Sequence, residues 1–140
     1  MELSELFRVG MVREEIFVVG QDNTASTVGS GGSQVLATPW MIAFMERAAH
    51  RLLAERLPAG MSSVGVHIDV NHLAPSPVGS QIRVRAEVTN LEGLRVSFSV
   101  KAWDQLELVG EGTHQRVVID ESRFLSRVEK KIKALKTDSE

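Results

Sequence analysis

The chain contains no cysteine, no excess of positive charge and no long uninterrupted hydrophobic run. Without cysteine it can form no disulfide framework, no thiolate nucleophile and no cysteine-based zinc site. Its 16 Lys and Arg residues face 18 Asp and Glu residues, a net charge of -2, so no overall basic field attracts nucleic acid. The N-terminus lacks a signal-peptide pattern, and no run reaches membrane-spanning length. We therefore expect a cytoplasmic protein that binds neither nucleic acid nor membrane.

The length of 140 residues is enough for one hydrophobic core but not for two, so we expect a single domain over residues 1–140. Short apolar stretches at 15–19 and 24–28 are typical of two strands. The sequence GSGGSQ at 29–34 then has the composition of a mobile loop, because glycine and serine leave the backbone free.

A long helix is predicted from Thr38 to Leu57. Thr38 can cap an orphan amide with its hydroxyl, and Pro39 suits the first helical position. Pro58 and Gly60 end the helix. Its first half is apolar on all sides, which is typical of a helix surrounded by protein, whereas its charged second half should reach solvent.

Four consecutive antiparallel strands are predicted after Gly60, because the hydrophobic residues begin to alternate there. In the first strand the inward residues are expected to be Val64, Val66, Ile68, Val70 and His72. The following strands begin near Ile82 and Leu94, with turns at 90–93 and 103–105, and the last ends near Ile119.

The C-terminal residues from 121 to about 135 are predicted to form a short amphipathic helix, with residues 137–140 frayed. Its apolar side is expected to contain Phe124, Val128, Ile132 and Leu135. The order of elements indicates an α+β protein in which an antiparallel β-sheet wraps around a long central helix.

Glu46 is the anomalous residue of the central helix, because it lies within the apolar segment WMIAFMERAA. Burial of a carboxylate is costly unless the group is paired or protonated, and it makes the group a better general base. The alternative is that Glu46 lies at a helix edge and pairs with Arg47 or His50 at the surface. The pattern leaves both interpretations open.

His72 and Thr38 are the next candidates. His72 is in phase with the apolar side of its strand and should point inward, whereas His67 should point to the opposite side. The structural alternative for His72 is a hydrogen-bonded core histidine. Capping alone explains Thr38, although amides at a helix start also attract a reacting carbonyl or a phosphate.

His114 and Arg116 share one side of the last strand. Arg116 can bind a carboxylate or a phosphate, but the pattern favours a surface charge. His67 and Asp69 resemble a fragment of a metal motif that lacks its third ligand, so no metal site is predicted.

Three segments resemble the fluoroacetyl-CoA thioesterase family, and the similarity extends over almost the whole chain. They are VLATPWMIAFME at 35–46, SVGVHIDVNH at 63–72 and GEGTHQR at 110–116. The family's catalytic set is a Thr at the helix start, a Glu eight residues later and a His on the next strand. Thr38, Glu46 and His72 match this set, since 46 minus 38 is 8 and 72 minus 46 is 26. Gly65 and Arg116 match positions that lie at the substrate in similar proteins.

The resemblance implies a hot-dog fold and a homodimer in which two sheets join side by side, with active sites between subunits and sometimes a tetramer. It also implies an acyl-CoA thioesterase without a cofactor, because CoA is part of the substrate. The fluoroacetyl enzyme has an aromatic-containing loop where this chain has residues 29–34. The resemblance therefore implies thioester hydrolysis rather than specificity for fluoroacetate.

Two catalytic routes are open for this set. Glu46 either activates water or attacks the carbonyl to form a transient anhydride, while His72 aids proton transfer and Thr38 orients the reacting group. Amides at the helix start and at Gly65 would stabilise the oxyanion. The alternatives are an acyl-CoA-binding or sensing module without turnover, and an acyl-CoA hydratase or dehydratase, whose motif we do not find.

Overall fold

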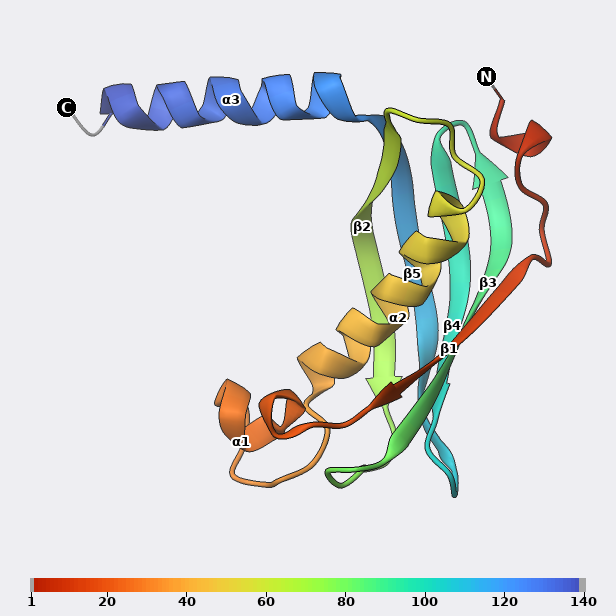
Figure 1. Cartoon of the computed structure of the whole chain (residues 1–140), viewed down its shortest axis with the longest axis vertical. Coiled ribbons are helices and arrows are strands. Elements are labelled where there is room, and N and C mark those ends of the chain that lie inside the picture. The colour runs from red at the N-terminus through yellow and green to blue at the C-terminus, as the bar shows by residue number, and fades with distance from the viewer. Residues whose placement is uncertain (1, 139–140) are drawn as a thin grey trace.

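A computed structural model describes residues 2–138 and contains a five-stranded antiparallel sheet wrapped around one long helix (Figure 1). The strands are β1 (Val12–Val18), β2 (Met61–His72), β3 (Gln81–Glu92), β4 (Arg95–Trp103) and β5 (Leu108–Asp120). The helices are α1 (Ala25–Val28), α2 (Thr38–Ala54) and α3 (Glu121–Asp138), with single 3-10 turns at Leu3–Glu5 and Gln21–Asn23. This arrangement confirms the predicted α+β class and the central helix.

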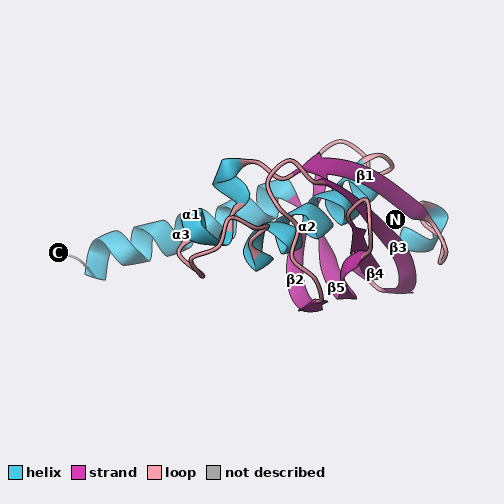
Figure 2. Cartoon of the chain, turned by 90° about the horizontal axis from the view of Figure 1, so that it is seen from below, coloured by secondary structure: helices cyan, strands magenta, loops and turns pink. Residues whose placement is uncertain are grey.

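The strand order in the sheet is β1-β3-β4-β5-β2, which leaves β1 and β2 at the two edges. Figure 2 shows the sheet curved around α2, and the hydrophobic core lies between them. The buried residues of α2 recur at helical spacing: Met41, Phe44, Met45, Ala48, Ala49, Leu52 and Leu53. They pack on the inner side chains of the strands, where buried residues alternate with more exposed ones along β3 and β4. The helical spacing of α2 and the alternation of the strands therefore supply one common core.

The start of α2 differs from the prediction in one respect that bears on function. Thr38 is the first helical residue, but Ala37 occupies the N-cap position and no side chain caps the helix. The predicted capping role of Thr38 is therefore wrong, and its hydroxyl is available to a neighbour from another element. The helix ends at Ala54, three residues before the predicted Leu57.

Residues 24–28, predicted as a strand, instead contain the short helix α1 at Ala25–Val28, with Thr24 as its N-cap. The Thr24 hydroxyl caps it by accepting a hydrogen bond from the Thr27 amide at 3.2 Å. Gly29 ends it in the left-handed region, with φ at 79°, which few other residues adopt. Local capping thus outweighed the β propensity of this stretch.

A β-bulge between Gly65 and His67 changes the phase of β2. The predicted inward side is correct after the bulge, where it includes His72, and wrong before it, where the buried side chain is Ser63 and Val66 is exposed. A bulge adds one residue to a strand, and the residues beyond it switch sides relative to a regular alternation. Both Gly65 and His72 consequently face α2.

The helix α3 begins where Asp120 pairs with Met61 and projects past β2, away from the body (Figure 1). It is longer than predicted and continues to Asp138, so Thr137 is helical rather than frayed, and residues 139–140 lie outside the described part. Many charged residues interrupt its sequence. Among residues 2–138, neither α3 nor another helix combines the length and apolar character needed to cross a membrane.

Candidate functional site

The first half of the site is a contact between Thr38, at the start of α2, and His72, at the end of β2. The Thr38 Oγ1 atom lies 2.7 Å from His72 Nδ1. Burial lowers the pKa of the His72 imidazole, and the nearby Ala74 backbone opposes this shift in part. The ring is therefore neutral at pH 7, with one donor and one acceptor nitrogen. Its Nε2 atom is buried and has no hydrogen-bond partner within residues 2–138.

Thr38 and His72 border a cavity of about 330 Å³. Its lining comes from α1, the loop that follows it, the start of α2 and the end of β2: Ala25, Ser30, Val35, Leu36, Thr38, His72, Leu73, Ala74 and Pro75. The glycine-rich segment at 29–34 thus contributes to the same cavity as the two candidate catalytic residues.

The second half of the site is centred on Glu46, about two turns and about 12 Å along α2 from Thr38. The Glu46 Oε2 atom lies 3.4 Å from Arg116 Nη1. The Glu46 side chain is 43% exposed, whereas that of Arg116 is 7% exposed. Glu46 is therefore at an open edge of the helix, as one interpretation held, but its partner is a buried arginine instead of Arg47 or His50.

Arg116 is buried, which overturns the surface position that the pattern favoured. Its Nε donates to Ser63 Oγ at 2.9 Å, and its Nη2 donates to the Ser63 carbonyl oxygen at 3.2 Å. Its Nη1 donates to His114 Nε2 at 3.1 Å. A planar guanidinium bonded along two sides keeps one orientation, so Nη1 stays directed at Glu46.

His114 was given no role from the sequence. Its position two residues before Arg116, on the same side of β5, could have indicated that it belongs to the same cluster. His114 is buried, and its Nδ1 lies 2.7 Å from the carbonyl oxygen of His67. Because a carbonyl only accepts and a guanidinium only donates, the His114 proton must be on Nδ1, and Nε2 must accept from Arg116. Burial is the main cause that lowers the pKa of His114, so this neutral tautomer persists at pH 7.

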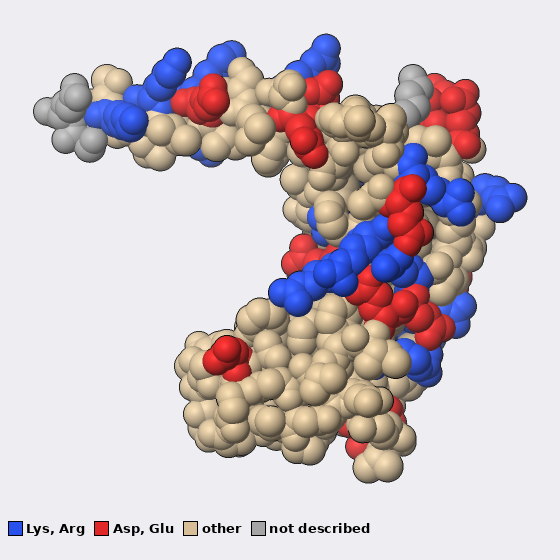
Figure 3. Space-filling view, in the orientation of Figure 1, with Lys and Arg blue, Asp and Glu red and all other residues tan. Residues whose placement is uncertain are grey.

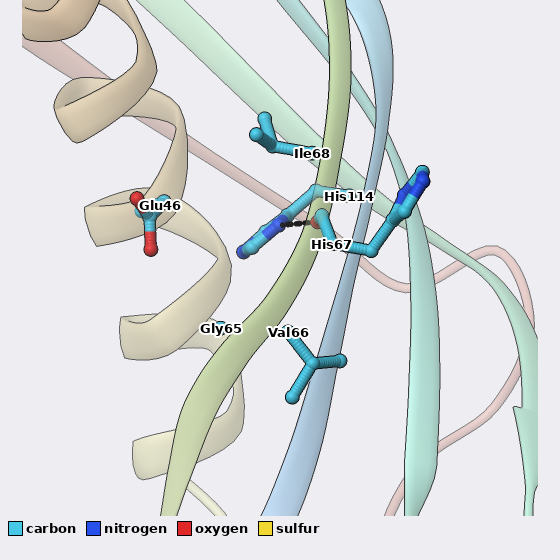
Figure 4. Close-up of a pocket in the computed structure, with 6 residues that line it drawn as sticks. All are labelled: Glu46, Gly65, Val66, His67, Ile68 and His114. Carbon is cyan, nitrogen blue, oxygen red and sulfur yellow. Dashed lines mark hydrogen bonds between the residues drawn. The ribbon is translucent and has the colours of Figure 1, made fainter.

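Gly65 allows this cluster to lie against β2. A Cβ at this position would be 2.7 Å from Glu46 Oε2, 3.2 Å from His114 Cε1 and 3.4 Å from Arg116 Nη1. A cavity of about 220 Å³ opens here, lined by Glu46, Gly65, Val66, His67, Ile68 and His114. Figure 4 shows the His114 ring pointing toward α2 and Glu46, whereas His67 points away, as predicted.

The predicted residues are consequently divided into two groups within one chain. Thr38 and His72 form one group, and Glu46, Gly65 and Arg116 form the other, together with His114. No hydrogen bond among residues 2–138 joins Glu46 to Thr38 or His72. The first group can orient a polar group and move a proton, and the second holds a carboxylate at the mouth of a cavity.

The sequence from residue 19 to 122 matches the family described as fluoroacetyl-CoA-specific thioesterase, FlK. The fluoroacetyl-CoA thioesterase of Streptantibioticus cattleyicolor is 40% identical over 101 residues, which are 72% of this chain and 73% of that protein. Similarity of this extent covers both halves of the site.

Solved structures give the same result. An FlK variant in complex with fluoroacetate and CoA is 35% identical, with a TM-score of 0.81 over 84% of this chain and 99% of that one. A hot-dog-like protein from Thermanaerovibrio acidaminovorans is 31% identical, with a TM-score of 0.87 over 94% of this chain and 97% of that one. A thioesterase superfamily member from Thermus thermophilus is 27% identical, with a TM-score of 0.81 over 91% of this chain and 96% of that one. The chain therefore belongs to the FlK family of fluoroacetyl-CoA thioesterases, within the hot-dog thioesterase superfamily.

Proposed function

We propose that this protein hydrolyses an acyl-CoA thioester, with Glu46 as its catalytic carboxylate. The observation that carries the proposal is the Glu46 carboxylate at the mouth of a cavity, beside a buried and immobilised Arg116. Membership of a thioesterase family supports the reaction class. Relatives solved with fluoroacetate and CoA, and with acetyl-CoA, support a CoA thioester as the substrate.

Each of these residues has a role in the proposed reaction. The thioester carbonyl binds against the backbone amide of Gly65 in one copy and the amides at the start of α2 in a second copy, which stabilise the developing oxyanion. Glu46 either removes a proton from the attacking water or attacks the carbonyl carbon itself, and water then opens the anhydride. In both routes a carbon–oxygen bond forms, the carbon–sulfur bond breaks, and CoA leaves as a thiol after His72 aids transfer of a proton. Thr38 orients the His72 ring.

A second copy of the chain is part of this proposal, because each chain holds the two groups about 12 Å apart along α2. The strand β2 has 12 residues, and no other strand within residues 2–138 pairs with its outer edge. Antiparallel pairing of two β2 edges would bring the His72 end of one copy beside Gly65 and Glu46 of the other.

Thioester hydrolysis is assigned to this chain without a particular acyl group. The segment at 29–34 contains no aromatic side chain, so we do not assign fluoroacetyl specificity to this chain. The cavities at the two groups measure about 330 Å³ and about 220 Å³.

The test is release of free thiol from a panel of acyl-CoA esters of increasing chain length. Because the protein has no cysteine, a thiol-reactive dye reports released CoA alone. Thiol release above the spontaneous rate, abolished or strongly reduced in Glu46→Gln, would support the proposal. Tight binding of an acyl-CoA by calorimetry without thiol release would instead identify a binding module. Hydration of an enoyl-CoA without thiol release would identify a hydratase.

A further inference from the structure

The helix α3 leaves the body of the protein with an apolar stripe uncovered. Leu125, Val128, Ile132 and Leu135 are 57%, 40%, 45% and 63% exposed. Their spacing places them on one side of the helix, next to Phe124 at its base. A contiguous exposed apolar stripe on an otherwise charged helix is typical of a contact surface. The helix cannot bury this stripe on its own sheet, because it points away from that sheet (Figure 1).

The direction of α3 identifies the flank on which its partner must lie. The helix starts at the Met61 end of β2 and runs past the unpaired edge of this strand. Figure 3 shows that the molecule is hollowed on this side, between α3 and the lobe that contains α1. This flank is the one that the second copy occupies when two β2 edges pair.

Two-fold symmetry then specifies what α3 meets. When His72 of one copy lies beside Gly65 of the other, antiparallel pairing places the Met61 end of one β2 just beyond the His72 end of the other. The helix α3 of one copy therefore runs along the end of the second copy's sheet at which β2 finishes and the turn between β4 and β5 lies. In each chain this end carries exposed apolar side chains, Leu73 at 52% and Leu106 at 90%.

We propose that α3 is an arm that clasps a second copy of this chain, with its apolar stripe packed across the end of that copy's sheet around Leu73 and Leu106. This inference rests on the dimer of the proposed function and extends it from the edge strands to the terminal helix. The same end of the sheet carries the Thr38–His72 pair, so each arm also borders the catalytic group of its neighbour. Two arms related by the symmetry axis clasp each other's subunits reciprocally.

Chemical cross-linking tests the arm directly, because the natural chain has no cysteine to interfere. The test variant carries Leu106→Cys and Ile132→Cys and is treated with a short bis-maleimide. Within one chain the 13 residues of β5, roughly 40 Å of strand, separate these two positions, so a cross-link between them must join two copies. The matched control carries Leu106→Cys and Ser126→Cys, with the second cysteine on the opposite side of α3.

We expect a covalent dimer in the test variant at a yield several-fold above that of the control. Equal yields would overturn the arm. A ladder of larger covalent oligomers would also overturn it, because a closed two-fold pair yields dimers alone.

Sedimentation analysis provides the second measurement. Val128→Asp with Ile132→Asp should raise the dimer dissociation constant by at least about tenfold. Ser126→Asp with Ala134→Asp adds the same charge outside the stripe and should leave the constant nearly unchanged. Circular dichroism checks that both variants keep the helix. An unchanged constant in the stripe variant would overturn the proposal. Conversion of a tetramer to a stable dimer would do the same, since it would place the stripe between dimers.

Both measurements are made without substrate, which keeps them separate from the test of catalysis. A wild-type dimer that depends on the stripe but releases no thiol would refute the thioesterase proposal and support the arm. If the protein releases thiol but its dimer dissociation constant is unchanged in the stripe variant, the arm alone would be refuted. A wild-type chain that sediments as a monomer would overturn the arm together with the dimer.

Discussion

The hydroxyl of Thr38 and the Nδ1 atom of His72 are 2.7 Å apart, although 34 residues separate them in the sequence. The contact joins the start of the central helix to the end of an edge strand. Because Thr38 is not the N-cap residue of α2, its hydroxyl is used for orienting an imidazole and not for stabilising the helix.

Removal of this hydroxyl should impair catalysis. Thr38→Val keeps the branched shape but leaves His72 Nδ1 without its partner. We expect turnover to fall by about 2- to 10-fold, the rate equivalent of the net free energy of one hydrogen bond. Thr38→Ser retains the hydroxyl and should keep most of the activity. Steady-state thiol release measures both. Full activity in Thr38→Val would show that the hydroxyl has no catalytic value.

Glu46→Gln should lower turnover by at least about 100-fold, because the amide can neither act as a base nor attack the thioester. The control is Glu107→Gln, an exposed residue in the turn before β5. Single-turnover kinetics with acyl-CoA separates binding from the chemical step. Wild-type turnover in Glu46→Gln would reject the assignment.

Gly65→Ala should lower turnover while the fold survives. The added Cβ would lie 2.7 Å from Glu46 Oε2, so the carboxylate must move away from its position beside Arg116. A displacement of this kind costs on the order of 10- to 100-fold in rate. Gly32→Ala is the matched control, since a Cβ there meets nothing within 4 Å. If both variants retain full activity, the close approach at Gly65 has no catalytic value.

Gly112→Ala should destabilise the protein. A Cβ there would overlap the backbone oxygen of Asp69 and the Cα of Val70, so β2 and β5 would have to separate locally. Overpacking of this kind costs about 1–3 kcal/mol, and more where backbone must move. Urea unfolding followed by circular dichroism gives the free energy of unfolding. A difference from wild type within about 0.5 kcal/mol would contradict the rigid pairing of these strands.

Acidification from pH 7.5 to 5 should destabilise the fold. Burial lowers the pKa of His50, His72 and His114 below the ordinary value of 6.5. Below pH 6.5 the unfolded chain therefore binds more protons than the folded one, and the free energy of unfolding falls with pH until the folded pKa values are reached.

The variant His114→Asn removes one of these groups and should flatten the decline by up to about 1.4 kcal/mol per pH unit. His67→Gln, at an exposed side chain that points away from the cluster, is the control (Figure 4). Chemical denaturation at several pH values gives both slopes. An unaltered slope in His114→Asn would mean that this histidine does not set the acid stability.

Periodicity predicted the long helix, the four later strands and the amphipathic terminal helix, because each buries residues at its own spacing. The bulge at Gly65 was missed because the apolar residues at 64, 66, 68 and 70 alternate across it without interruption, as in a regular strand. The sequence pattern also misplaced Arg116. This residue is buried by Glu46 and Ser63, which lie 70 and 53 residues away in the sequence, and no local pattern encodes such distant pairings.

The candidate catalytic residues came from the resemblance to the thioesterase family, whereas the separation of Thr38 at the start of α2 from Glu46 in its middle came from the structure. A matched spacing along the chain suggests candidate residues for a site. It does not show that a helix of 17 residues keeps Thr38 and Glu46 apart. His114 illustrates a second limit, because its tautomer follows from the geometry of two neighbours and not from its own identity.

Because of the bulge in β2, a change of one residue in the length of this strand would alter the site. Gly65 pairs with Arg116 and His67 pairs with Gln115, so Val66 has no opposite residue on β5. Deletion of Val66 would restore a regular alternation and turn either Gly65 or His72 to the outer face of the sheet. The one extra residue of the bulge therefore lets Gly65 and His72 face the same side of the sheet. A functional homologue should keep the same number of residues between these two positions even where the side chains differ.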